Sequence, residues 1–143
     1  MEFSAAHRLY REELGDQENF DLFGPCSNPY GHGHNYVLEA TFEGPLDPHT
    51  GMVIHFRELK GRLQELVVAP LDHRHLNLDV AFLRGILPTS ENLVRCLWER
   101  IAQPAEGRPY RLHRLRLYST ARNWVDYHGP TVHESPLKET PNA

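Results

Sequence analysis

Hydrophobic periodicity constrains this chain most, because it changes from a period of two to helical spacing and back again. Strand-favouring side chains occupy residues 1–9 and 32–43, and apolar residues at helical spacing follow in residues 56–67 and 89–101. The period of two returns in residues 110–120 and 123–129. The order strand, strand, helix, helix, strand, strand predicts an α+β domain, with an antiparallel sheet that carries both helices on one face.

The ends of the two helices can be predicted from local signals. The first helix has its apolar stripe at Phe56, Leu59, Leu63, Leu66 and Val67, and we expect it to end before Pro70. The second helix begins after Pro88, with Thr89 or Ser90 as its N-cap. Cys96 falls among the apolar residues of this helix, where a thiol is expected to serve as packing.

The length of 143 residues suits one domain, which we place at residues 1–129. Residues 130–143 are rich in Pro, Glu and Thr, and we expect a mobile tail there. The sequence has no apolar run that approaches the length of a membrane span, and no secretory leader precedes the first motif. These features predict a cytoplasmic protein that does not bind membranes.

The charge and the cysteine content argue against two further classes of protein, nucleic-acid-binding proteins and disulfide scaffolds. A net charge of −4 disfavours nucleic-acid binding, and we expect the cluster Arg108, Arg111, Arg114 and Arg116 to form the solvent face of a strand. Two cysteines are too few for a disulfide scaffold and fit a reducing compartment.

Histidines are unusually frequent, with ten in the chain, and three of them predict a metal site. His32 and His34 are two residues apart, so that both imidazoles leave the same face of a strand. If the first strand pairs with this one, His7 supplies a third nitrogen. Three imidazoles without a fourth protein ligand are typical of a catalytic zinc with an open position. The alternative is that His-Gly-His forms a polar turn and that His7 is an ordinary strand histidine.

Other residues near these histidines can carry proton-transfer chemistry. Cys26 lies in a loop rich in Gly, Pro and Asn, where nearby positive charge favours a reactive thiolate. Asp72 and His73 can tune such a thiol or relay its proton, although adjacent acid and base side chains are also common on surfaces. Glu91 has a competing structural role, because a carboxylate in the first turn of a helix favours the helix dipole.

Several motifs together resemble the 6-pyruvoyl-tetrahydropterin synthase family, in its animal-type branch. The resemblance runs over residues 3–128, through "FSAAHRL", "ENFDLFGPCSNPYGHGHNY", "LDPHTGMVIHFRELK", "PLDHRHLN", "PTSENL" and "LYST". It implies a tunnelling fold, in which a four-stranded antiparallel sheet with two helices assembles into β-barrel trimers, and two trimers stack into a homohexamer. Five residues separate Cys26 from His32, which is the spacing of the pyruvoyl synthase branch. The bacterial 6-carboxy-tetrahydropterin synthases usually have three.

The resemblance also implies roles for individual residues. His7, His32 and His34 would bind Zn²⁺, Cys26 would be the catalytic thiol, and Asp72 and His73 would act with it from a neighbouring subunit. Thr89, Ser90 and Glu91, in the family's "PTxEN" motif, would bind the pterin. The family reaction converts 7,8-dihydroneopterin triphosphate to 6-pyruvoyl-tetrahydropterin and triphosphate, and Mg²⁺ would accompany the triphosphate.

The sequence departs from the family pattern in two places. Met1 lies two residues before the Phe3 of the first motif, whereas relatives usually begin further upstream, so we expect either a short first strand or a truncated start. Ser119 stands where the family has a pterin-anchoring glutamate. Because of this serine, an alternative function is that of a related zinc pterin lyase with a different substrate, either 6-carboxy-tetrahydropterin synthase-like or dihydroneopterin aldolase-like. A third alternative is a non-catalytic pterin- or metal-binding protein.

Overall fold

The computed structural model describes residues 1–103, 107–132, 134 and 137 of the chain. Its helices, strands and short helical turns are β1 (Glu2–His7), α1 (Asp16–Phe23), a 3-10 turn (Gly24–Ser27), β2 (His32–Glu43), α2 (Phe56–Leu63), a π turn (Gln64–Val68), α3 (Ala69–Leu71), β3 (Arg74–His75), a 3-10 turn (Ala81–Leu83), α4 (Ser90–Ile101), β4 (Arg111–Thr120) and β5 (Asn123–Tyr127).

The sheet has five strands in the order β3-β1-β2-β4-β5. Three of the four pairings are antiparallel, and β3 pairs parallel with β1. The prediction of a four-stranded, wholly antiparallel sheet was therefore wrong at this edge. β3 is only two residues long, and a segment so short shows no period in the sequence. It forms because the free edge of β1 bonds the chain on both sides of it, from His73 N–H to the Ser4 carbonyl and from Leu76 N–H to the Ala6 carbonyl.

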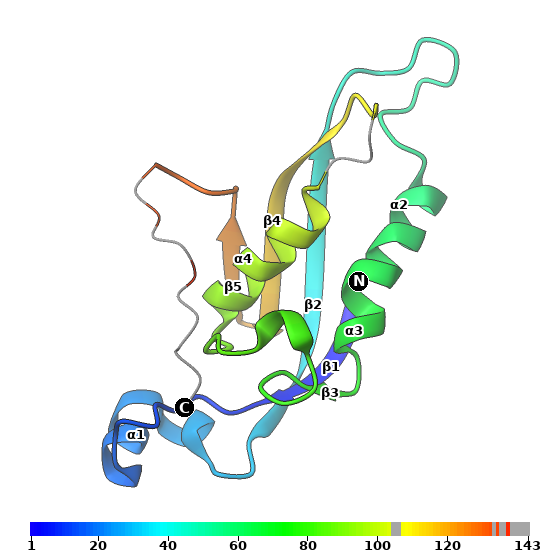
Figure 1. Cartoon of the computed structure of the whole chain (residues 1–143). Coiled ribbons are helices and arrows are strands. Elements are labelled where there is room, and N and C mark those ends of the chain that lie inside the picture. Colours follow the sequence, from blue (N-terminus) through cyan, green and yellow to red (C-terminus); the bar gives the residue numbers. More distant parts are fainter. Residues whose placement is uncertain (104–106, 133, 135–136, 138–143) are drawn as a thin grey trace.

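The helices α2 and α4 cover one face of this sheet, as Figure 1 shows. The buried core joins them to alternate residues of the strands. It includes Leu63, Val67, Leu93 and Leu97 from the helices and Phe3, Tyr36, Leu38, Leu115 and Leu117 from the sheet. The period of two places His7, His32 and His34 on this same covered face, at the ends of their strands.

The first predicted helix does not end before Pro70. After α2 the chain stays helical through the π turn and through α3, which contains Pro70. A proline has no N–H with which to bond the carbonyl four residues earlier, here that of Leu66. Arg100 of α4 donates its Nε–H to that carbonyl at 3.1 Å, so the carbonyl has a partner that Pro70 cannot supply. None of the helices in the described part of the chain is long and apolar enough to cross a membrane.

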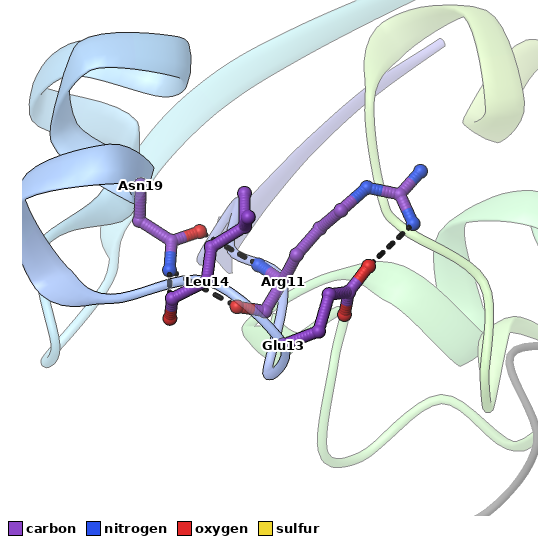
Figure 2. Close-up of polar contacts among 4 residues, drawn as sticks. All are labelled: Arg11, Glu13, Leu14 and Asn19. Carbon is purple, nitrogen blue, oxygen red and sulfur yellow. Dashed lines mark hydrogen bonds and ion pairs between the residues drawn. The ribbon is translucent and has the colours of Figure 1, made fainter.

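The polar segment between β1 and β2 contains the eight-residue helix α1. The buried Asn19 organises this segment, as Figure 2 shows. Its Oδ1 accepts from the Arg11 N–H at 2.7 Å, and its Nδ2 donates to the carbonyls of Arg11, Leu14 and Gly15 at 3.0–3.2 Å. These bonds hold the chain after β1 in one conformation and lead it toward the segment that carries Cys26.

The expected mobile tail lies mostly outside the described residues, at positions 133, 135–136 and 138–143. Within the described part, Glu134 forms an ion pair with Arg95 at 2.8 Å and accepts a hydrogen bond from the Tyr127 hydroxyl at 2.8 Å. This residue is therefore attached to α4 and β5.

Candidate metal and thiol site

Three imidazoles converge where β1 ends and β2 begins. The two strands pair in the register that the metal-site prediction required, with His7 opposite His32 and Ala5 opposite His34. The Nε2 atom of His7 lies 3.0 Å from that of His32 and 3.2 Å from that of His34. One ligand atom from each of the three residues lies within 4.8 Å of the others. The structure thus brings together the three histidines that strand periodicity selected.

The hydrogen bonds around the cluster leave its nitrogens free to act as ligands. Nδ1 of His7 lies 2.9 Å from the carbonyl oxygen of Pro88, which can only accept. His7 must therefore carry its proton on Nδ1, and its Nε2 lone pair faces the other two rings. A hydrogen bond to the backbone of Ser119 supports the ring of His34 in a similar way. Such bonds to the second ring nitrogen are typical of metal-binding histidines.

The geometry fits a metal ion of ordinary size. Around a tetrahedral zinc with bonds of about 2.0–2.1 Å, ligand nitrogens lie about 3.4 Å apart, close to the separations in the cluster. Burial is the main reason that the pKa values of His7 and His34 are lowered, and the neighbouring histidines add to the effect. The imidazoles of His7 and His34 therefore stay neutral, which is the form that binds metal, at a lower pH than ordinary histidines do. The donor set is consistent with zinc and leaves one position for water or substrate.

The lowered pKa of His7 predicts a pH dependence of stability in the metal-free protein. Burial holds this pKa at about 4, against 6.5 in the unfolded chain, so protonation favours the unfolded state. The free energy of unfolding should fall as the pH drops from about 6.5 to about 4, by about 3 kcal/mol from this residue. Urea unfolding of chelator-treated protein across this pH range measures the loss. The variant His7→Gln should show a shallower decline, and an identical decline in both proteins would contradict the assignment.

Cys26 lies beside this cluster, in the 3-10 turn Gly24–Ser27. The side chain is partly exposed, unlike the buried Cys96. The pKa of Tyr36 is raised, mainly by burial and further by the charge of the nearby Cys26. The Tyr36 ring in turn meets the His34 ring edge to face, with 5.4 Å between ring centroids. Tyr36 is therefore close to both the thiol and the His34 ring, which places Cys26 in the neighbourhood of the cluster.

Asp72 and His73 form a hydrogen-bonded pair at the other edge of β1. Asp72 Oδ2 lies 2.8 Å from His73 Nδ1, and Asp72 Oδ1 accepts from the Ser4 N–H at 2.8 Å. The bond from Ser4, and then the one from His73, hold the pKa of Asp72 below its usual range. His73 has a φ of 57°, a left-handed conformation that is uncommon for a residue other than glycine. Its exposed ring lines an open cavity of about 520 Å³ together with Ser4 and Asn35.

This cavity lies mainly on the sheet face that the helices do not cover, because Ser4 alternates with the buried Phe3 and Ala5 along β1. His34 of the imidazole cluster lines this cavity as well, so within one chain His73 and the cluster border the same open cavity.

The residues expected to bind substrate border the imidazole cluster. Thr89 is the N-cap of α4, and its hydroxyl accepts from the Asn92 N–H at 3.2 Å, so this side chain also has a structural role. Ser90 and the exposed Glu91 follow in the first turn, next to the Pro88 carbonyl that bonds His7. Ser119 lies on β4, and its hydroxyl donates to the Asn123 carbonyl at 3.5 Å.

Two of the contacting groups were missed by sequence reasoning. The carbonyl of Pro88 and the backbone of Ser119 orient His7 and His34, yet a backbone group is present in every residue. No side-chain pattern could have identified them, and only the fold shows which carbonyls reach the rings.

Comparison with known proteins gives a consistent result. The family model described as 6-pyruvoyl tetrahydropterin synthase matches residues 1–130. The 6-pyruvoyl tetrahydrobiopterin synthases of Poecilia reticulata and Homo sapiens are 42% and 40% identical to this chain; the alignments cover 89% and 90% of it, and 85% and 88% of those proteins. The solved structure of Caenorhabditis elegans 6-pyruvoyl tetrahydropterin synthase superposes with a TM-score of 0.82 at 37% identity, over 91% of each chain.

Proposed function

Because the chain belongs to the 6-pyruvoyl tetrahydropterin synthase family, we propose that it converts 7,8-dihydroneopterin triphosphate to 6-pyruvoyl-tetrahydropterin and triphosphate. The observation that carries the proposal is the convergence of His7, His32 and His34 beside the turn that holds Cys26. This pairing of a metal-binding cluster with an accessible thiol suits proton transfer at carbon followed by loss of a leaving group.

Each group has a task in this reaction. His7, His32 and His34 would hold Zn²⁺, which when bound would polarise the hydroxyls of the substrate side chain and acidify the neighbouring C–H groups. Cys26, as a thiolate, would take a proton from one carbon and return one to another. The Asp72–His73 pair would receive and donate protons beside it, while elimination releases triphosphate with no net redox change. Magnesium bound to the triphosphate would balance its charge.

The proposed active site is completed by a neighbouring subunit. In one chain the exposed His73 ring lines an open cavity together with Ser4, Asn35 and His34 of the cluster. An assembly of subunits would bring the pair of one chain to the thiol of the next, and we propose a homohexamer built from two trimers. Light scattering during size-exclusion chromatography should then give six times the mass of the chain, and a monomer that turns over the triphosphate at full rate would contradict this arrangement.

The direct test of the function is turnover. Zinc-loaded protein should release triphosphate from 7,8-dihydroneopterin triphosphate and form a tetrahydropterin product, both of which can be followed by chromatography. Chelator-treated protein is the matched control. Absence of turnover by the zinc-loaded oligomer would count against the proposal.

A related pterin lyase with a different substrate is the second candidate, because Ser119 cannot reproduce a charged bond to the pterin. The resemblance places a glutamate at this position, and a hydroxyl lacks the two acceptor oxygens of a carboxylate. Screening dihydroneopterin, sepiapterin and the triphosphate as substrates separates the two candidates. A higher kcat/KM for dihydroneopterin or sepiapterin than for the triphosphate would favour the second.

The variant Ser119→Glu tests the role of this position. We expect the KM for the triphosphate to fall about 10-fold or more, since a hydrogen bond to a charged group contributes about 1.5–3 kcal/mol. Zinc content should not change, because His34 bonds the backbone of residue 119 and not its side chain. Steady-state kinetics on Ser119→Glu and on the uncharged control Ser119→Gln measure the effect. An equal KM in all three proteins would show that residue 119 does not contact the pterin.

A further inference from the structure

Arg8 directly follows His7 and reaches the turn that carries Cys26. Its Nε–H donates to the carbonyl of Ser27 at 3.0 Å. The next residue, Leu9, donates its backbone N–H to the carbonyl of Cys26 at 2.8 Å. Two consecutive residues after His7 are thus bonded to two consecutive carbonyls of the thiol turn.

The thiol turn is closed by its own hydrogen bonds. The Ser27 hydroxyl donates to the Gly24 carbonyl at 2.8 Å, and Asn28 N–H donates to the Pro25 carbonyl at 3.2 Å. Ser27 is buried. A turn bonded in this way is expected to move as one body, so its attachment to β1 sets the place of the Cys26 side chain.

Arg8 is itself held in place from two sides. Asn77 accepts from the Arg8 N–H at 2.8 Å and donates its Nδ2–H to the Arg8 carbonyl at 2.9 Å. The guanidinium carbon lies 4.0 Å from the centroid of the Tyr10 ring, a cation–π contact that directs the side chain. The backbone and the guanidinium of Arg8 therefore both have defined positions.

We propose that Arg8 is a positioning residue that sets the Cys26 thiol relative to the imidazole cluster. Arg8 is the residue after His7, and it bonds the Ser27 carbonyl. The distance from the thiol turn to the metal site is therefore defined through a short stretch of chain. The inference rests on the proposed function in giving Cys26 a role in the reaction. Misplacing a reacting group by about 1 Å costs on the order of 100-fold in rate, which makes such a contact significant.

The test compares Arg8→Gln and Arg8→Lys with the matched control Arg11→Gln. The Arg11 side chain lies in the same segment between β1 and β2 and pairs with Glu13 at the surface. We expect Arg8→Gln to lower kcat about 10- to 100-fold while KM stays within about threefold and zinc content is unchanged. Arg8→Lys keeps a donor and a cation, and should recover part of the loss. Arg11→Gln should match the wild type.

A readout that does not need the substrate is the alkylation rate of Cys26 by iodoacetamide, followed by peptide mass spectrometry. Displacement of the turn should change this rate about fivefold or more in Arg8→Gln and less in Arg8→Lys. Unchanged kcat and alkylation in Arg8→Gln would overturn the proposal. The proposal would also be overturned if the loss of activity in Arg8→Gln equalled the fraction of protein that urea titrations show to be unfolded, while Cys26 of the folded variant was alkylated at the normal rate. If the wild type shows no turnover, the proposed function fails, whereas alkylation still decides the role of Arg8.

Discussion

Replacing Cys26 with alanine should lower kcat about 100- to 10,000-fold while leaving bound zinc and the fold intact. Proton transfer by a positioned side chain contributes about 10²- to 10⁴-fold, and alanine supplies no group that can take its place. The thiol belongs to a partly exposed surface turn, so its removal leaves little cavity in the core. Triphosphate release measured at saturating substrate, together with zinc analysis and circular dichroism, checks the prediction.

Cys96→Ala is the matched control for this experiment. Burial is the main cause that raises the pKa of Cys96 to about 11, so its thiol stays protonated and packs among the apolar residues of α4. Its replacement should cost some stability and leave kcat unchanged. If Cys26→Ala keeps full activity, Cys26 is not the proton shuttle. A protein that binds pterin and zinc without turnover, and does so equally well in Cys26→Ala, would instead support the non-catalytic alternative.

The convergence of the three histidines could be predicted because its information is local and periodic. His32 and His34 are two residues apart, and the alternation of Phe3, Ala5 and His7 identifies the face of the first strand. Once antiparallel pairing is assumed, all three rings must meet on the covered side of the sheet. The same reasoning located α4 and limited its N-cap to Thr89 or Ser90, of which Thr89 is the N-cap, since a helix start depends on a few neighbouring residues.

The features that escaped prediction depend on partners far away in the sequence. β3 exists because the edge of β1 accepts it, and the helix continues past Pro70 at a place where Arg100 of α4 bonds the Leu66 carbonyl. The order of the residues near Asp72 does not show which side of β1 the pair occupies. That placement depends on two hydrogen bonds with the backbone of Ser4, whose N–H donates to Asp72 Oδ1 and whose carbonyl accepts from the His73 N–H.

Removing one imidazole should abolish stable zinc binding, and His34→Ala tests this without removing the buried His7. His7 is almost fully buried, whereas His34 is partly exposed at the mouth of the cluster. With two protein ligands in place of three, the affinity for zinc should fall by more than about 100-fold, beyond the loss that follows from mutating an outer hydrogen-bond partner. The activity should fall with it, because the proposed polarisation of the substrate hydroxyls depends on the bound ion.

Competition with a chromophoric chelator measures this affinity without reference to turnover, and His49→Ala provides the control. His49 lies exposed in the loop between β2 and α2, where its backbone N–H bonds Asp47 Oδ1 at 2.8 Å. This variant removes an imidazole from the chain but not from the cluster, so the zinc affinity should equal that of the wild type. Equal zinc affinity in His34→Ala and His49→Ala would show that the ion binds elsewhere. Zinc loss in His34→Ala with unchanged turnover would separate the metal from the reaction and leave the thiol and the Asp72–His73 pair to carry it.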